Sequence, residues 1–359
     1  MAFLIIVFTL VVLTSWMVFS VLIAPAASLL PWLYPLHAAL YGLAAIVIGI
    51  VFYTRAKARV RHESPVHQWI SRYFFVFIGV HSLLIPATLV QMLVHVLSGA
   101  DQAQLALATL AGAYAVAAAS VLTAKIGPRL QRVKLAGSGP VLKIAQISDL
   151  HIGVNIGPRY VKKVVELANA GQPDCIVLTG DIGDGDSRAH QAAIAELAQL
   201  RAPLGVFLIL GNHELYWQAG EWIKAFRAAG LQVLVDEARD LHWQGRPFTL
   251  LGLAPSASKP MAEQLAMHPA TGPVLVLSHY PSRAQEAAAA GAKLFLAGHT
   301  HGGQYWPWSW LIYLFHRYAK GYYQLGAMQI YINRGTGYWG PPLRLGARAE
   351  VSLLEWPLG

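Results

Sequence analysis

The pattern of apolar positions along this chain changes once, near residue 125. Before that point apolar residues form long runs with few charges, and after it they form short runs separated by polar stretches. A helix of about 20 apolar residues is long enough to cross the roughly 30 Å hydrocarbon core of a bilayer. We therefore predict a four-helix transmembrane bundle in residues 1–124. Its spans are Phe3–Ile23, Leu33–Tyr53, Tyr73–Leu97 and Ala103–Ala124.

The first of these runs has a second interpretation, as a cleaved signal peptide ending near Ala24-Pro25-Ala26. Signal peptides begin with a basic segment and have a shorter apolar core. No Lys or Arg precedes Phe3, and the run is long. We therefore predict that the first helix is retained.

The short apolar runs of the second half are bounded by Gly and Pro and alternate with helix-like stretches, which is typical of buried strands in an α/β domain. The expected strands are Val141–Ile147, Cys175–Thr179, Gly205–Leu210, Val274–Leu277 and Lys293–Ala297. The expected helices are Pro158–Asn169, Arg188–Leu200, Gly220–Ala229, Pro260–Met267 and Ser282–Ala290. An α/β domain is thus predicted over residues 141–359. The basic, Gly- and Pro-containing residues 125–140 are predicted to form a linker, either lying on anionic headgroups or simply solvated.

Composition and charge support this division. The 359 residues are 55% hydrophobic and only 13% charged, a balance too apolar for a purely soluble enzyme. Of the formal charge of +9, residues 1–140 carry +7 and the remainder +2. Because the basic character belongs mainly to the membrane part, it favours an anionic lipid surface as partner, and not nucleic acid. The single cysteine, Cys175, falls in an expected core strand and is interpreted as a buried structural thiol.

The orientation in the membrane follows from Lys and Arg in the short loops. One basic segment, Arg55–Arg72, separates spans two and three, and another, Lys125–Lys134, follows span four. The loops after spans one and three contain neither residue type. We predict a multi-pass protein of the cytoplasmic (inner) membrane whose termini and α/β domain face the cytoplasm.

Two histidines of the bundle, His81 and His95, lie fourteen residues apart, close to four helical turns. On one helix face they could hold a cofactor such as haem. The plainer interpretation is packing within the bundle for His81 and an interfacial position for His95.

Chemistry-bearing residues follow the expected strands directly. The segments are Asp149-Leu150-His151, Gly180-Asp181-Ile182-Gly183-Asp184, Gly211-Asn212-His213-Glu214, Ser278-His279 and Gly298-His299-Thr300-His301. Carboxyl ends of strands in open α/β sheets gather along one edge, where such folds place their sites. Imidazole is the commonest protein ligand for metals. Taken singly, each residue has an ordinary interpretation, since Asp181 could cap a helix and Asn212 could occupy a turn.

As an ordered series, these five segments closely resemble the calcineurin-like metallophosphoesterase superfamily. The ending Gly298–Gln304, with Asn333-Arg334-Gly335 and Arg344–Arg348 downstream, resembles its bacterial membrane-associated branch of phosphodiesterases and UDP-2,3-diacylglucosamine pyrophosphatases. The resemblance implies an αββα sandwich that binds two divalent metal ions. Mixed nitrogen and oxygen ligands suit Mn, Fe or Zn better than Mg or Ca.

The resemblance also implies a role for each site residue. Asp181 would bridge the two ions. Asp149, His151 and His301 would complete one metal site, and Asn212, His279 and His299 the other. His213 would orient phosphate or protonate the leaving oxygen. Asp184 and Glu214 would orient His213 or other ligands, although Glu214 could equally lie on the surface.

Substrate contacts are expected from Asn212, Arg334 and Arg344, although a structural ion pair would explain either arginine equally well. The uncharged segment Tyr305–Phe315 contains three Trp and two Tyr. Trp and Tyr favour the membrane–water interface. The segment is therefore interpreted as a lipid-contacting loop, with His316, Arg317 and Lys320 near headgroup phosphates, and core packing is the alternative.

Together these features predict a membrane-anchored, dinuclear metal-dependent phosphohydrolase. Its expected substrate is a lipid-linked phosphodiester or pyrophosphate, and its expected partners are the bilayer and that substrate. A general phosphodiesterase that the anchor merely localises is one alternative. A non-catalytic membrane scaffold or sensor is another, which the full set of candidate ligands disfavours.

Overall fold

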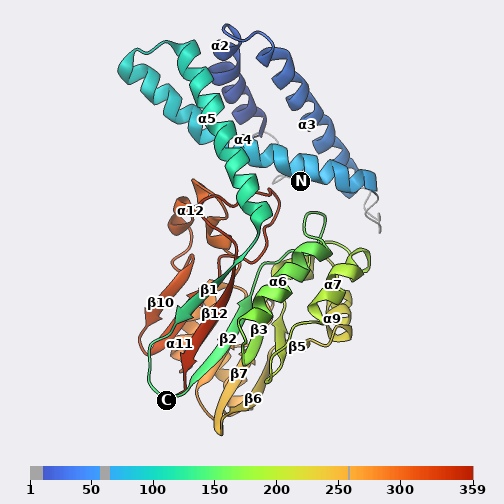
Figure 1. The fold of residues 1–359 in the computed structure, drawn as a ribbon, viewed down its shortest axis with the longest axis vertical. Helices are drawn as coiled ribbons and strands as arrows, with labels where there is room; N and C mark the ends of the chain where they lie inside the picture. Colours follow the sequence, from blue (N-terminus) through green and yellow to red (C-terminus); the bar gives the residue numbers. More distant parts are fainter. Residues whose placement is uncertain (1–10, 57–64, 258, 359) are drawn as a thin grey trace. The chain divides into compact units, whose positions relative to one another are not determined.

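The strands of the second half form two six-stranded mixed sheets (Figure 1). The computed structural model describes residues 11–56, 65–257 and 259–358. The first sheet has the order β1-β12-β2-β3-β4-β5, with bounds Arg129–Lys134, Glu350–Pro357, Val141–Ile147, Cys175–Thr179, Val206–Ile209 and Gln232–Leu234. The second has the order β10-β11-β9-β8-β7-β6, with bounds Gly321–Leu325, Met328–Ile332, Leu294–Ala297, Val274–Leu277, Arg246–Gly252 and Glu237–Trp243.

Residues of one strand alternate between two hydrophobic cores, because successive side chains point to opposite faces of a sheet. In β3, Cys175 and Val177 enter the core between the sheets, whereas Ile176 and Leu178 enter the core outside the first sheet. β8 divides in the same way between the central core and the core outside the second sheet. Burial on both faces explains why these strands read as continuous apolar runs.

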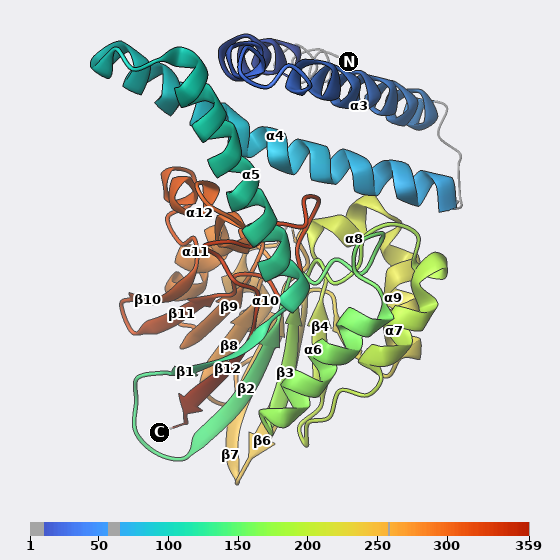
Figure 2. The ribbon, with the colours of Figure 1, turned by 45° about the horizontal axis from the view of Figure 1, so that its top comes forward.

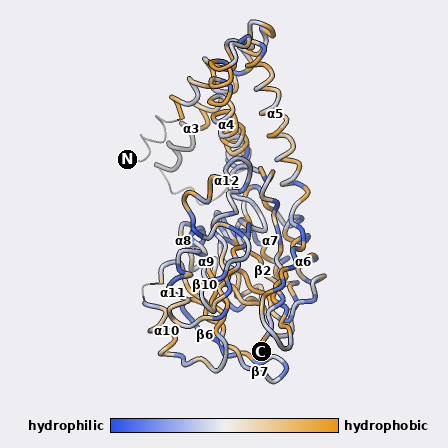
Figure 3. Tube along the Cα trace, turned by 90° about the vertical axis from the view of Figure 1, so that its left-hand side faces the viewer, coloured by the Kyte–Doolittle hydropathy of each residue, from blue (hydrophilic) through white to orange (hydrophobic). Residues whose placement is uncertain are grey.

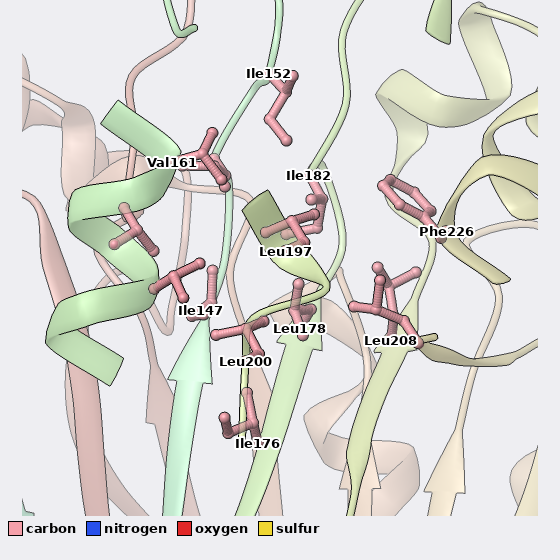
Figure 4. Close-up of a cluster of buried hydrophobic side chains, with 14 of the residues drawn as sticks. Ile147, Ile152, Val161, Ile176, Leu178, Ile182, Leu197, Leu200, Leu208 and Phe226 are labelled. Atoms are coloured by element: carbon pink, nitrogen blue, oxygen red, sulfur yellow. The ribbon is translucent and has the colours of Figure 1, made fainter. Parts of the chain in front are cut away.

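Helices complete the two outer cores. The helical segments of this part are α6 (Pro158–Ala170), η2 (Ser187–His190), α7 (Gln191–Leu197), α8 (Asn212–Tyr216), α9 (Ala219–Ala228), α10 (Met261–Met267), η3 (Pro281–Arg283), α11 (Ala284–Ala289), η4 (His301–Gly303), α12 (Trp308–Leu311) and η5 (Ile312–Leu314). Helices α6, α7 and α9 lie against the first sheet (Figure 2), and their side chains pack on it (Figure 4). Side chains of α10 and α11 pack on the second. The layers are those of an α/β sandwich with two mixed sheets, as expected.

The expected strands are found within one residue at each end, and three of them match at both ends. Residues 129–134, which we placed in the linker, instead form β1, paired in parallel with β12. The cause is backbone pairing at the sheet edge, which requires no apolar pattern. Charged side chains such as Arg132 are suited to an edge strand because they discourage pairing with another chain.

The chain divides into two units, residues 123–339 with 344–359, described above, and residues 1–122 with 340–343. The second unit is helical and contains η1 (Phe19–Ile23), α2 (Ala24–Ala27), α3 (Leu33–Ala56), α4 (Pro65–Ser98) and most of α5 (Gln102–Ile126). Figure 3 shows the hydrophobic character of these helices.

Within the described residues, two helices are long and apolar enough to cross a membrane, Gln68–Ser98 and Gln102–Ile126. They coincide with the third and fourth predicted spans. Val11–Ala27 and Leu33–Val47 are shorter apolar helices. The start of the first predicted span, before Val11, lies outside the described residues, as do Lys57, Arg59 and Arg61 of the first basic segment.

The two bundle histidines make local contacts. The ring nitrogens of His81 lie 3.1 Å from Thr14 Oγ1 and 3.1 Å from Tyr41 Oη. Nδ1 of His95 donates to the carbonyl of Ala100 at the end of α4. Both nitrogens of His81 contact side chains of neighbouring helices, as the packing interpretation predicts.

Candidate metal centre

The predicted ligands lie at the carboxyl ends of strands from both sheets. Asp149 and His151 follow β2, and Asp181 follows β3. From the remaining strands, Asn212 follows β4, His279 follows β8, and His299 and His301 follow β9. Because β2, β3 and β4 are parallel, as are β8 and β9, these ends meet along one side of the sandwich. The topology therefore brings together residues that are up to 152 positions apart in the sequence.

The ligands form two groups. In one, oxygen and nitrogen atoms of Asp149, His151 and His301 lie within 4.8 Å of one another. In the other, the same holds for Asp181, His279 and His299, and Asn212 Oδ1 lies 3.1 Å from His279 Nε2. The family resemblance implied the same two groups, with Asp181 shared between them, and the assignment of each residue as a metal ligand stays a prediction.

Asp181 faces both groups. Its Oδ2 lies 3.2 Å from His279 Nε2 and 3.9 Å from His151 Nε2. Its Oδ1 accepts a hydrogen bond from the backbone N–H of His213, at 2.9 Å. One carboxylate oxygen lies between imidazoles of the two groups, as a ligand shared by two cations would.

Burial keeps most of these imidazoles neutral. It lowers the pKa of His151 and of His299 to about 4 each, and it lowers the pKa of His301 as well. A neutral imidazole has a lone pair to give to a metal, whereas a protonated one has none. Nε2 of His151 and Nε2 of His301 converge to 3.1 Å of each other. This donor chemistry fits divalent cations.

His279 and Asp181 behave as a buried ion pair before any cation binds. Burial alone would lower the pKa of His279, but the charge of Asp181 and its hydrogen bond raise it to about 9. Burial alone would raise the pKa of Asp181, yet His279, His151 and His213 hold it below its ordinary value. For Asp149 the neighbouring groups do not offset the effect of burial, which raises its pKa to about 6.

His213 lies beside the first group without belonging to either predicted ligand set. Its ring is 4.6 Å from that of His151 between centroids, and its Nδ1 is 3.2 Å from Asp184 Oδ1. Burial opposes a charge on His213, but Asp184 and Asp181 outweigh burial and raise its pKa. His151, Asp184 and His213 also form a third cluster within 4.8 Å, so the role of His213 needs a direct test.

Of the two roles predicted for Glu214, orienting a ligand or lying on the surface, its contacts fit the first. It is fully buried and does not lie on the surface. Its carboxylate accepts hydrogen bonds from the backbone N–H groups of four residues. These are Asp181 at 3.1 Å, Ile182 at 2.6 Å, Gly183 at 2.7 Å and Gly211 at 2.7 Å. Burial raises its pKa to about 7. Glu214 thus fixes the loop that carries Asp181 to the loop that carries Asn212.

Two glycines of the motifs leave room for the ligand carboxylates. A Cβ atom on Gly211 would collide with Oδ1 of Asp181, and one on Gly298 would collide with Oδ2 of Asp149. The ligands themselves have unusual backbones, because Asp149, His151, Asp181, His299 and His301 all have positive φ, between 50° and 71°. Such conformations cost energy in residues other than Gly and concentrate at functional sites.

The two predicted substrate arginines differ in their surroundings. Arg344 is fully buried, and its guanidinium donates to the carbonyls of Gly337, Arg334, His301 and Ala347 and lies 3.1 Å from His301 Nδ1. Arg344 is therefore a structural residue that supports the loop of His301, and its buried side chain is not accessible to substrate. Arg334 is partly exposed, and its Nε lies 3.8 Å from Glu350 Oε2.

The aromatic segment Tyr305–Phe315, which follows His299 and His301, lies on the surface. Trp310, Leu314 and Phe315 are 70%, 76% and 78% exposed. The core alternative therefore fails for these side chains. Two hydrogen bonds attach the segment to the domain. The N–H of Trp306 donates to the carbonyl of Leu345 at 2.7 Å, and Lys320 Nζ donates to the carbonyl of Ser309 at 2.9 Å.

Replacing Glu214 with Ala would leave four buried N–H groups without their acceptor. Each unsatisfied buried group costs about 1–3 kcal/mol. We expect the free energy of unfolding to fall by at least about 3 kcal/mol and metal retention to weaken. Thermal unfolding of the detergent-solubilised protein, with metal content after gel filtration, measures both. Glu221→Ala, at a half-exposed position on α9, is the matched control, and an equal effect of the two substitutions would contradict the role of Glu214.

Comparison with known proteins agrees with this geometry. Residues 142–303 match the sequence profile of calcineurin-like phosphoesterases. A "Transmembrane protein with metallophosphoesterase domain" from Bos taurus is 31% identical over 59% of this chain, and the chain spans only about half of it, 52%. An uncharacterized metallophosphoesterase of Aquifex aeolicus is 30% identical over 60% of this chain and 85% of its own. The uncharacterized metallophosphoesterase YkuE of Bacillus subtilis is 32% identical, and the match covers 59% of this chain and 77% of YkuE. With His and Asp groups placed for metal binding, this chain belongs to the calcineurin-like phosphoesterase family.

Proposed function

We propose that this protein is a membrane-anchored, dinuclear metal-dependent phosphohydrolase that cleaves a phosphodiester or pyrophosphate bond in a lipid-linked substrate. The observation that carries the lipid part is the exposed aromatic segment, which begins four residues after the ligand His301. Exposed apolar patches beside a site mark interaction with lipids or with other apolar partners.

Different side chains of the site would bind the metal ions and transfer the proton. Two divalent cations held by the two groups would neutralise phosphate charge and supply a hydroxide near neutral pH. Asp149, His151 and His301 hold one position, and Asn212, His279 and His299 hold the other, with Asp181 shared. His213, oriented by Asp184, would protonate the leaving oxygen. The rings of Tyr216 and Trp339 lie 5.4 Å from that of His213 between centroids and line the approach to it.

The aromatic segment suits the membrane interface by its composition and by the exposure of its side chains. Its exposed Trp and Tyr rings have the amphipathic character that favours the headgroup level, and Leu314 and Phe315 add purely apolar area. An acyl chain that leaves the bilayer could follow this surface toward His299 and His301. A UDP-2,3-diacylglucosamine-like molecule, which joins acyl chains to a pyrophosphate, is the narrower proposal, and it rests on sequence resemblance alone.

Anchoring places the site at the membrane. We propose that the four apolar segments of residues 1–124 are all transmembrane helices and that the catalytic domain faces the cytoplasm. Two helices of spanning length, and a bovine relative whose name describes a transmembrane protein, support anchoring. The orientation is supported by the Lys and Arg residues of the two basic segments, which a four-helix arrangement places on one side.

The substrate class can be tested with two compounds on detergent-solubilised protein. We expect hydrolysis of both UDP-2,3-diacylglucosamine and bis-p-nitrophenyl phosphate. Replacing Trp310 and Leu314 together with Ser should lower kcat/KM for the lipid substrate at least about tenfold, because apolar contact area is lost. Activity on the soluble diester should persist. Met267→Ser, at an exposed position near the end of α10, is the control. Hydrolysis of the soluble diester alone would favour a general phosphodiesterase.

The roles of Asp181 and His213 separate metal binding from proton transfer. Asp181→Asn should lose both metal retention and turnover, because the shared carboxylate is gone. His213→Asn should retain both metals, while turnover falls by roughly two to four orders of magnitude if the imidazole acts as the acid. The loss should be smaller with a p-nitrophenolate leaving group. Metal analysis of the purified variants decides, and a missing metal in His213→Asn would make His213 a ligand.

The orientation predicts the behaviour of a reporter fused after Gly359. A reporter that functions only in the cytoplasm should be active there, and one that functions only in the periplasm should be inactive. The opposite pattern would overturn the cytoplasmic placement and remove the support for a nucleotide-linked substrate.

A further inference from the structure

Two basic side chains, those of Lys320 and Arg334, flank the loop that carries His299 and His301. Gly302 follows His301 and has a φ of +59°. A Cβ atom at Gly302 would lie 3.0 Å from Cδ of Lys320 and 3.4 Å from Cγ of Arg334. The stems of both side chains therefore pack against this glycine, one residue beyond a metal ligand.

The topology of the second sheet explains this convergence. β9 and β11 are parallel, and Ala297 at the end of β9 is in register with Ile332 at the end of β11. β10 runs antiparallel to β11, with Gly321 opposite Ile332. Arg334, just after β11, and Lys320, just before β10, thus leave the sheet at the edge from which His299 and His301 leave it.

The positive charge at this edge is only partly compensated. Glu350 is the carboxylate near Arg334, at 3.8 Å, and it already accepts hydrogen bonds through Oε1 from Tyr331 Oη at 2.8 Å and Ser352 Oγ at 3.2 Å. Arg334 Nε is buried and makes no hydrogen bond within the described part of the chain. Burial lowers the pKa of Lys320, and the charge of Arg334 lowers it further, as expected for two cations that lie close together.

We propose that Lys320 and Arg334 form a subsite for a second phosphoryl group of the substrate, adjacent to the one that the metal centre binds. This inference rests on the proposed phosphohydrolase function and makes it narrower. The substrate would be a pyrophosphate diester, in which a bridging oxygen joins two phosphoryl groups, and not a simple phosphodiester.

The chemistry of the two halves of the site explains this choice. The metal centre neutralises the phosphoryl group that is attacked, whereas a neighbouring phosphoryl group keeps its own negative charge and requires its own donors. A guanidinium binds phosphate oxygens through more than one N–H, and an ammonium supplies a point charge. Arg334 is the residue that should distinguish a substrate with two phosphoryl groups from one with a single group, because Lys320 Nζ already donates to the carbonyl of Ser309.

Binding of soluble compounds that contain no P–O–P bond tests the subsite without depending on lipid or on pyrophosphate cleavage. The metal-loaded, full-length protein in detergent would be titrated calorimetrically with a dialkyl methylenebisphosphonate, which has a P–C–P link, and with dimethyl phosphate. Arg334→Gln should weaken binding of the bisphosphonate by roughly ten- to a hundredfold, the value of a hydrogen bond to a charged group. Binding of dimethyl phosphate should change less than about twofold, within the usual effect of a remote surface substitution.

Arg239→Gln is the matched control, because Arg239 is a half-exposed arginine paired with Glu237 on β6, at the far edge of the same sheet. It should leave both affinities unchanged. Arg334→Lys keeps the charge and should recover part of the lost affinity, which also guards against a folding defect in Arg334→Gln.

Equal weakening of both ligands by Arg334→Gln would overturn the subsite and assign Arg334 a structural role through Glu350. Unchanged affinity for both would overturn it as well. Because the readout is binding, a protein that binds the bisphosphonate through Arg334 but hydrolyses no diester would contradict the proposed function and leave the subsite intact.

Discussion

A single carboxylate, that of Asp181, connects the parts of this site. Its Oδ2 faces imidazoles of both ligand groups, and its Oδ1 receives the backbone N–H of His213. Such a buried charge is tolerated only when it is paired and hydrogen-bonded. The protein meets this requirement by holding the loop after β3 in place with Glu214, whose carboxylate binds four backbone N–H groups. The position of the shared ligand therefore depends on a residue that contacts no ligand side chain in the described hydrogen-bond network.

Conformational strain is the cost of this arrangement. Five of the seven ligand residues have left-handed backbones, and two glycines are required where ligand carboxylates approach the main chain. Strained conformations persist only where the surrounding structure over-determines them. Here the two sheets provide that constraint, because each strained residue lies two to four residues after the end of β2, β3 or β9, strands whose side chains are mostly buried.

The surroundings of the metal centre are asymmetric in chemistry. Aromatic rings of Tyr216 and Trp339 adjoin His213, whereas Lys320 and Arg334 adjoin the loop of His301, which continues into the exposed aromatic segment. A substrate with a planar leaving group, a second anionic group and an apolar tail would find complementary surface for each part. That asymmetry, more than the metal ligands themselves, distinguishes the specificity we propose from general phosphodiester hydrolysis.

The sequence by itself determined the features that depend on local patterns. The buried strands β3 and β8 could be located because burial on both faces leaves a continuous apolar run, and a ligand follows each run within two residues. β2 was located from its mostly apolar residues, although it contains Lys143 and Gln146. The ordered motifs also indicated the ligand groups. Edge strands such as β1 and β10 left no such signal, because backbone pairing holds them and their exposed side chains are free to be polar.

Only the tertiary structure decided the roles of the remaining charged residues. Arg334 and Arg344 look alike in the sequence, yet one is partly exposed and the other is fully buried among backbone carbonyls. Glu214 was expected to orient His213 or another ligand, or to lie on the surface, and only the structure shows that it binds the main chain of the two loops that carry Asp181 and Asn212. The physical reason is the same in each case: the partners of a long polar side chain are set by which distant strands lie next to it, and no local pattern encodes that neighbourhood.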